Sequence, residues 1–341
     1  MMRLPYFAYR APRTVREAAE LLASSPNAML VAGGTDVLPN MKRRQQVPST
    51  LIGLRQVDEL RTIANGEGLR IGAGVTLSAL VDNPLVRTSY GGLWQAAAQV
   101  ATPHLRNMGT IGGNLCLDTR CNYYDQNYEW RKAIDFCMKK DGGTCWVATS
   151  SPRCLAVSST DTAPALIALA ASVTLVSAVG SRRIRAADLY RNDGIDYLTR
   201  RRDEILAAVE LPPPDGWRST YWKLRRRGSS DFPVLSVAAA VKIAAGTVED
   251  ARIVLGAVAS RPVEAPAAAA LLVGGPLDDA AIARVAEAAA QPARPMDNTD
   301  FSLLWRKRVT RDFVTYALSE LRGDDMRARR RSIARQTLPM A

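Results

Sequence analysis

A run of three prolines constrains the fold of this chain more than any other segment. The stretch "LPPPDG" occupies 211–216, and consecutive prolines continue neither a helix nor a central strand. The chain has 341 residues, which is longer than one ordinary domain. The proline run therefore predicts a domain boundary, with one folding unit before it and another after it.

Helix and strand patterns alternate at the start of the chain. "TVREAAELLAS" is typical of a helix, and "AMLVAGGT" and "STLIGL" are typical of strands. This alternation predicts a small α/β subdomain over 1–57. A second subdomain, 58–215, begins with "GLRIGAGVTLSAL", which predicts a strand, a turn and a helix capped by Thr76.

The longest apolar run, 163–180, has the length of a membrane span, but two serines and a threonine interrupt it. Its first half predicts a buried helix opened by Asp161 and Pro164, and "SVTLVSAV" predicts a strand. Beyond the prolines, "STYWKLRRRGSSDFPVLSVAAAVKI" and "ARIVLGAVA" indicate strands. The alanine-rich stretches after Arg261 and "SLLWRKRVTRDFVTYALSEL" indicate helices. We expect an α+β domain over 216–325 and a basic tail over 326–341.

The net charge of +12 raises the question of nucleic acid. Arginine triplets lie at 200–202 and 225–227, and the tail carries "RARRRSIAR". These clusters lie outside any recognisable nucleic-acid-binding pattern. We expect neither nucleic acid nor membrane as a partner, and a tail that touches a protein. The N-terminus shows no secretory signal pattern, which favours a cytoplasmic location.

Two glycine-rich segments follow predicted strands or helices. "VAGGTD" spans 31–36 and "HLRNMGTIGGNL" spans 104–115. Paired glycines let successive backbone N–H groups point into one concavity, where they can hold an anion such as a pyrophosphate. Neither segment is the G-x-G-x-x-G motif or a P-loop, so each alone is weak evidence for a phosphate site.

Taken together and in order, these segments resemble a known family. "VAGGTDVLPNMK", "IGAGVTLSAL", "ATPHLRNMGTIGGNLC" and "SSTDTAPALIAL" are similar to the FAD-binding subunit of the xanthine dehydrogenase family of molybdenum hydroxylases. The resemblance implies an α+β fold. A two-lobed FAD-binding domain of the vanillyl-alcohol-oxidase/PCMH type would be followed by a C-terminal domain like that of the CO dehydrogenase flavoprotein.

The resemblance also implies a set of FAD contacts. Backbone groups of the two glycine turns would hold the pyrophosphate, Asp161 would bind the adenosine part, and Leu206 and Lys223 would lie near the flavin ring. The only histidine, His104, would pack on FAD or donate to it rather than catalyse, and no residue of this chain is expected to be catalytic. The full implied set is Ala32, Gly33, Gly34, Thr35, Asp36, Thr102, His104, Asn107, Thr110, Ile111, Gly112, Gly113, Asn114, Asp161, Leu206 and Lys223.

Four of the five cysteines lie in one segment, at Cys121, Cys137, Cys145 and Cys154, with 15, 7 and 8 residues between them. Disulfides are disfavoured because nothing indicates export. A zinc knuckle spacing is absent and the histidine lies elsewhere. By spacing alone, an iron–sulfur cluster, a zinc site and unrelated buried thiols all stay open.

The resemblance favours the cluster. The β subunit of 4-hydroxybenzoyl-CoA reductase carries an inserted loop that binds a [4Fe–4S] cluster through four cysteines, and the segment 117–156 looks like that insertion. Cys116 would then be a small buried hydrophobe. This implies an aromatic-degradation enzyme in which ferredoxin donates electrons that pass through [4Fe–4S] and FAD to a [2Fe–2S] small subunit and a molybdopterin large subunit. The alternatives are a flavin subunit that passes electrons outward, as in xanthine or CO dehydrogenase, and a zinc-stapled scaffold.

Overall fold

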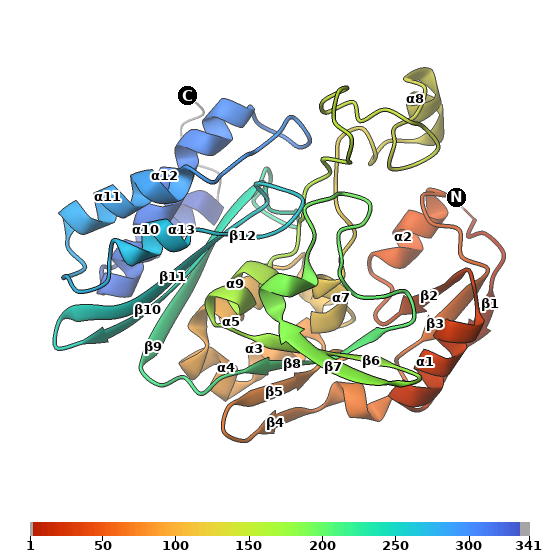
Figure 1. The fold of residues 1–341 in the computed structure, drawn as a ribbon, viewed down its shortest axis with the longest axis horizontal. Coiled ribbons are helices and arrows are strands. Elements are labelled where there is room, and N and C mark those ends of the chain that lie inside the picture. Colours follow the sequence, from red (N-terminus) through yellow and green to blue (C-terminus); the bar gives the residue numbers. More distant parts are fainter. Residues whose placement is uncertain (1–2, 335–341) are drawn as a thin grey trace.

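The computed structural model describes residues 3–334, which form three sheets with helices packed on them. The sheets follow one another along the chain (Figure 1). Their strand orders are β1-β3-β2, β4-β5-β8-β6-β7 and β12-β11-β10-β9. The predicted division after 57 and after 215 falls between sheets, because β3 ends at Gly53 and β8 ends at Leu211, next to the prolines.

The first sheet is parallel, as the alternating pattern predicts. Thr14 caps its long helix by accepting from the N–H of Glu17. The short edge strand β1 escaped the sequence analysis because its three residues are exposed and carry no burial alternation. The elements are β1 (Ala8–Arg10), α1 (Val15–Ser24), β2 (Ala28–Val31), α2 (Val37–Lys42) and β3 (Thr50–Gly53).

The second unit is an antiparallel five-stranded sheet. A series of short helices, which ends in the glycine-containing helix α7, follows its strand β5. Thr76 caps α3 as predicted, accepting from the N–H of Ala79 at 3.2 Å. The elements up to the insert are η1 (Asp58–Arg61), β4 (Ile63–Asn65), β5 (Leu69–Gly72), α3 (Leu77–Asp82), α4 (Pro84–Ser89), α5 (Gly91–Ala98), α6 (Pro103–Arg106) and α7 (Ile111–Leu115). Those after it are α9 (Thr162–Ala168), β6 (Ser172–Ser177), β7 (Gly180–Arg185), η2 (Ala186–Leu189) and β8 (Ile205–Leu211).

The apolar run 163–180 is a helix followed by a strand, as predicted. Every residue of α9 is buried, whereas alternate residues of β6 are. Asp161 occupies the N-cap position of α9, as predicted, but its side chain makes no capping hydrogen bond. The carboxylate pairs instead with a buried lysine, described below. Within residues 3–334, no helix is both long and apolar enough to cross a membrane.

The C-terminal unit is the expected α+β domain. An antiparallel sheet packs on helices around a separate apolar core, and the helices cover one face of that sheet (Figure 1). The elements are β9 (Trp217–Leu224), β10 (Leu235–Ala244), β11 (Thr247–Gly256), β12 (Val263–Glu264), α10 (Pro266–Ala270), α11 (Asp279–Ala290), α12 (Leu303–Arg322) and α13 (Arg327–Ala334).

The basic tail is only partly solvated. Its residues 327–334 form α13, and Arg330 lies against the ring of Trp222 at 4.1 Å and donates from its Nε to Glu320 at 2.7 Å. The last part of the predicted tail, 335–341, lies outside the described residues.

The cysteine-rich segment leaves the second unit after α7 and returns before α9. Its one helix, α8 (Tyr128–Ala133), begins at Asn127, whose side chain accepts from the N–H of Trp130 at 2.9 Å. The segment stands out from the body of the molecule, with α8 at its tip (Figure 1). Its remaining path is made of turns held by local hydrogen bonds, such as the N–H of Gly142 to the carbonyl of Cys137 at 3.1 Å.

Candidate flavin site and the adjoining thiol cluster

A cavity of about 430 Å³ lies between the first and second units. The turn after β2, the helix α7 and the start of β8 line it, so the two glycine-rich segments meet at one site as expected. Eleven of the predicted FAD contacts are in its wall: Ala32, Gly33, Gly34, Thr35, Asp36, Thr110, Gly112, Gly113, Asn114, Asp161 and Leu206.

The two glycine turns touch each other directly. A Cβ atom on Gly33 would lie 1.8 Å from the carbonyl oxygen of Met108, so only glycine allows this approach. Gly34 has a φ of +71°, which lies in the left-handed region that disfavours other residues. The glycines after β2 therefore serve both a close backbone contact and a turn.

The second turn is fixed by side chains that face its backbone. Thr110 accepts from the N–H of Gly113 at 3.0 Å. The Oδ1 atom of Asn114 accepts from the hydroxyl of Thr160 at 2.9 Å and from the N–H of Thr162 at 3.0 Å. These bonds tie α7 to the segment before α9, and they hold Gly113 exposed at the cavity wall.

Asp161 and Lys223 form an ion pair beneath the cavity. Their side chains are 4% and 0% exposed, and Nζ lies 2.9 Å from Oδ2. The hydroxyl of Tyr221 also donates to Asp161 at 2.7 Å. Burial raises the pKa of Asp161 and lowers that of Lys223, while their mutual attraction opposes both shifts.

Several predicted FAD contacts do not reach the cavity wall. Lys223 donates to the carbonyls of Gln99 and Asp231 as well as to Asp161, so the structure places it in an ion-pair network rather than at the wall. Among the described residues, α6 contributes Leu105 to the lining. The remaining residues outside that lining are Thr102, His104, Asn107 and Ile111.

Sequence reasoning missed the basic rim of the cavity. Arg200, Arg202 and Arg227 line it, although the sequence analysis assigned the arginine triplets to the general positive charge of the chain. The signal was present in the sequence, because two triplets close to strand ends can supply cations to an anionic ligand. Only the fold shows that both triplets reach the same opening.

One wall residue has an unused acceptor. Gln46 lines the cavity, and its buried Oε1 atom has no hydrogen-bond partner among the described residues. An exposed glycine backbone, a basic rim and an unsatisfied acceptor fit a ligand that carries phosphates and hydrogen-bond donors. The cavity therefore fits FAD in the chemistry of its wall.

Asp36 connects the cavity to the cysteine-rich segment. Its carboxylate accepts from the guanidinium of Arg120, the residue before Cys121, and from the amide of Asn40 at 3.1 Å. Burial raises the pKa of Asp36, although the charge of Arg120 opposes that shift. Arg120 in turn lies over the ring of Phe232, another wall residue, at 4.7 Å.

The four predicted cysteine ligands converge. Cys121, Cys137, Cys145 and Cys154 are buried free thiols, and three of them pack in one small cluster with Tyr124. Burial, with a smaller contribution from the neighbouring thiols Cys154 and Cys137, raises the pKa of Cys121 to about 12. Burial likewise raises the pKa of Cys154 to about 11, with Cys145 and Cys137 adding to the effect. We call these four residues the thiol cluster.

The donor set of the thiol cluster is all sulfur. In the part of the chain that the structure describes, no group of three or more His, Cys, Asp or Glu side chains is arranged to hold a metal ion. Three of the four buried thiols pack together, and the set of four matches an iron–sulfur cluster in ligand type and number.

Comparisons with known proteins define the class of this chain. Residues 5–214 match the model of the FAD binding domain in molybdopterin dehydrogenase, and residues 219–321 match the CO dehydrogenase flavoprotein C-terminal domain. The chain belongs to this family of FAD-binding medium subunits of the xanthine and CO dehydrogenase type. The two matched regions meet at the proline run.

The individual relatives place it further. The aldehyde oxidoreductase FAD-binding subunit PaoB of Escherichia coli K12 is 33% identical over 325 residues, which cover 92% of this chain and 99% of the relative. The glyceraldehyde dehydrogenase medium chain of Sulfolobus acidocaldarius is 24% identical over 318 residues, which cover 93% of this chain and 99% of that relative.

Solved structures agree on the fold. Carbon monoxide dehydrogenase from Hydrogenophaga pseudoflava superposes with a TM-score of 0.77 at 27% identity, over 93% of this chain and 98% of that one. Quinoline 2-oxidoreductase from Pseudomonas putida 86 superposes with a TM-score of 0.74 at 28% identity, over 94% of this chain and 98% of that one. These similarities confirm the predicted fold class and the FAD domain. They support a molybdenum hydroxylase flavin subunit, the alternative of the sequence analysis, and lend no support to 4-hydroxybenzoyl-CoA reductase.

Proposed function

We propose that this chain is the flavin- and iron–sulfur-binding subunit of a molybdenum hydroxylase that oxidises aldehydes. The single observation that carries the proposal is the thiol cluster placed beside a flavin cavity, on a chain similar to PaoB along nearly its whole length. Substrate chemistry would belong to a molybdopterin large subunit. This chain and a [2Fe–2S] small subunit would transfer electrons.

FAD would be held mainly by backbone. The turn after β2 and the exposed N-terminal part of α7 would face the pyrophosphate, since both line the cavity with glycine backbone. Arg200 and Arg227 would offset the phosphate charge. Bound FAD supplies hydride and single-electron chemistry, whereas the chain supplies orientation and electrostatics.

The thiol cluster would bind [4Fe–4S]. Zinc also binds thiolates but has no redox chemistry. A zinc site would therefore not explain why the thiol cluster adjoins a flavin cavity. Cys116 lines that cavity, whereas Cys121 begins the thiol cluster five residues later. With a cluster bound there, the insert would hold it beside the cofactor that exchanges electrons.

The decisive experiment uses the purified complex of this chain with its molybdenum and [2Fe–2S] subunits. We expect reduction of a one-electron dye by aromatic and aliphatic aldehydes. We also expect four irons and acid-labile sulfide on this chain beyond those of the small subunit. Formation of benzoyl-CoA from 4-hydroxybenzoyl-CoA with a low-potential donor, without aldehyde oxidation, would replace the proposal by the reductase. Zinc in place of iron on this chain would instead show that the chain is a zinc-stapled scaffold subunit.

A cysteine substitution tests the ligand assignment. Cys137→Ser should lose the additional iron and sulfide while FAD stays bound, because the cavity wall does not include Cys137. The matched control is Cys116→Ser, which changes the one cysteine outside the thiol cluster and should keep the iron. Unchanged iron and sulfide in Cys137→Ser would show that Cys137 is not a ligand.

A further inference from the structure

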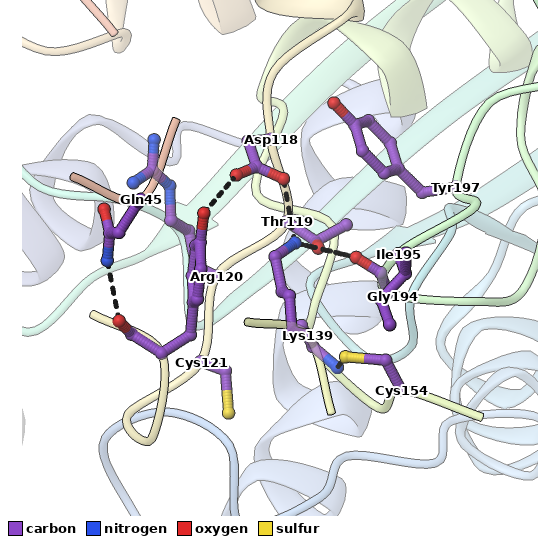
Figure 2. Close-up of polar contacts among 12 residues, drawn as sticks. Gln45, Asp118, Thr119, Arg120, Cys121, Lys139, Cys154, Gly194, Ile195 and Tyr197 are labelled. Atoms are coloured by element: carbon purple, nitrogen blue, oxygen red, sulfur yellow. Dashed lines mark hydrogen bonds and ion pairs between the residues drawn. The ribbon is translucent and has the colours of Figure 1, made fainter. Parts of the chain in front are cut away.

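A buried lysine lies between the thiol cluster and the flavin cavity. The Nζ atom of Lys139 is 2.8 Å from Asp118 Oδ1 and donates to the carbonyl of Gly194 at 2.7 Å and to the hydroxyl of Thr119. Figure 2 shows the ammonium group enclosed by these three acceptors. The side chains of Lys139 and Asp118 are 6% and 9% exposed, so water screens their charges weakly.

The two charges face different sites. Asp118 is part of the cavity wall. Lys139 follows Cys137 by two residues, and its ammonium group lies over the ring of Tyr124, which packs with three of the four thiols. The ion pair is therefore oriented, with its negative end toward the cavity and its positive end toward the thiol cluster.

Two aromatic rings hold the lysine in this position. Its Nζ lies 4.8 Å from the ring of Tyr124, which packs in the thiol cluster, and 5.7 Å from the ring of Tyr197, which lines the cavity. The hydroxyl of Tyr124 also donates to Asp118 Oδ2 at 3.2 Å. Tyr124 thus contacts both ends of the pair, and Tyr197 contacts the lysine end.

A second ion pair repeats the polarity. Asp36 is in the cavity wall, and its partner Arg120 directly precedes Cys121. In both pairs the carboxylate lines the cavity whereas the cation does not. Arg120 also pairs with Asp125 of the insert at 3.3 Å.

We propose that the Asp118–Lys139 pair sets the difference in reduction potential between the two redox sites, favouring the reduced state at the thiol cluster over the reduced state in the cavity. Reduction adds negative charge, which a fixed cation stabilises and a fixed anion opposes. This inference rests on the proposed function, since it requires a redox centre at the thiol cluster. It assigns the outward direction of electron flow, from the cavity toward the insert, to named residues.

The test measures midpoint potentials in the purified complex, with EPR for the iron–sulfur centre and absorbance for the flavin. Lys139→Gln should lower the midpoint potential of the thiol-cluster centre by at least 59 mV. For a one-electron couple this corresponds to a tenfold change in the ratio of reduced to oxidised centre. The flavin potential should fall less. Lys139→Arg keeps the charge and should stay near the wild type. Lys132→Gln removes an exposed cation of the same insert and is the matched control.

Asp118→Asn covers the case in which Lys139→Gln does not fold, because it removes the other end of the pair. It should raise the reduction potential of the flavin more than that of the thiol-cluster centre. Both substitutions should therefore reduce the difference in potential between the two centres. An unchanged difference in midpoint potential between the two centres, in Lys139→Gln or Asp118→Asn that retains iron and flavin, would overturn this inference and leave the proposed function standing. Absence of iron from this chain in the wild-type complex would overturn the cluster proposal and the inference with it.

Discussion

Gly113→Ala should weaken FAD binding while leaving the apoprotein as stable as before, or more so. Gly113 lies inside the short helix α7 and is exposed at the cavity wall. A Cβ atom there would meet Thr110 Oγ1 at 3.1 Å as its nearest neighbour, a contact that a shift of a few tenths of an ångström relieves. The new methyl group would otherwise project into the cavity.

The two effects have opposite signs. Alanine in place of glycine inside a helix stabilises it by about 0.5–1 kcal/mol, from which the tight threonine contact subtracts. A methyl group in the path of the pyrophosphate should raise the FAD dissociation constant at least tenfold, or about 1.4 kcal/mol. General damage to the fold would instead lower both the stability of the apoprotein and its affinity for FAD.

The assay titrates apoprotein with FAD by flavin fluorescence and measures urea unfolding of the same apoprotein. Gly66→Ala is the matched control, because a Cβ atom on Gly66 meets nothing within 4 Å and the residue lies in the turn between β4 and β5. The control should bind FAD like the wild type. Wild-type affinity in Gly113→Ala would refute the placement of the pyrophosphate against α7.

Two further substitutions test other contacts. Gly33→Ala should lose both FAD and stability, by about 1–3 kcal/mol from overpacking, because the carbonyl of Met108 occupies the space of the new methyl group; unchanged urea unfolding would contradict this. Burial would raise the pKa of Glu320, but hydrogen bonds and the charge of Arg330 outweigh it and lower the pKa below the ordinary 4.5. The resulting stabilisation, about 2 kcal/mol for hydrogen bonds to a charged group, is complete above pH 4.5 and is lost as the pH falls through the lower folded-state pKa. Thermal melts over this acid range should show that loss in the wild type and a weaker pH dependence in Arg330→Met.

Local signals in the sequence were enough for most of the elements. Thr76 and the helix after it, the strand that leads into the turn at Gly33 and Gly34, and the proline boundary all depend on neighbours a few residues away. That both glycine turns serve one site was implied by the resemblance to a family and not by local signals. The local features are predictable because capping, turn geometry and periodicity act over one or two turns of chain.

Contacts between distant residues were not predictable in the same way. Lys223 was expected near the flavin ring, yet the fold uses it to neutralise Asp161, 62 positions earlier. Asp161 in turn gives up the capping role that its position before α9 suggested. A buried charge requires a partner more strongly than a helix start requires a cap, so the tertiary contact decides the outcome.

The pair of consecutive lysines at 139 and 140 shows where sequence information ends. Both follow Cys137 and Met138, and nothing in the residues distinguishes them. The fold buries the side chain of Lys139 at 6% exposure against Asp118, whereas that of Lys140 stays 32% exposed beside Asp141 at 3.3 Å. An ammonium group that water screens can shift a nearby potential only slightly, and one that carboxylate and rings enclose can shift it strongly. The redox influence proposed for the first lysine therefore comes from its position in the fold, not from its charge.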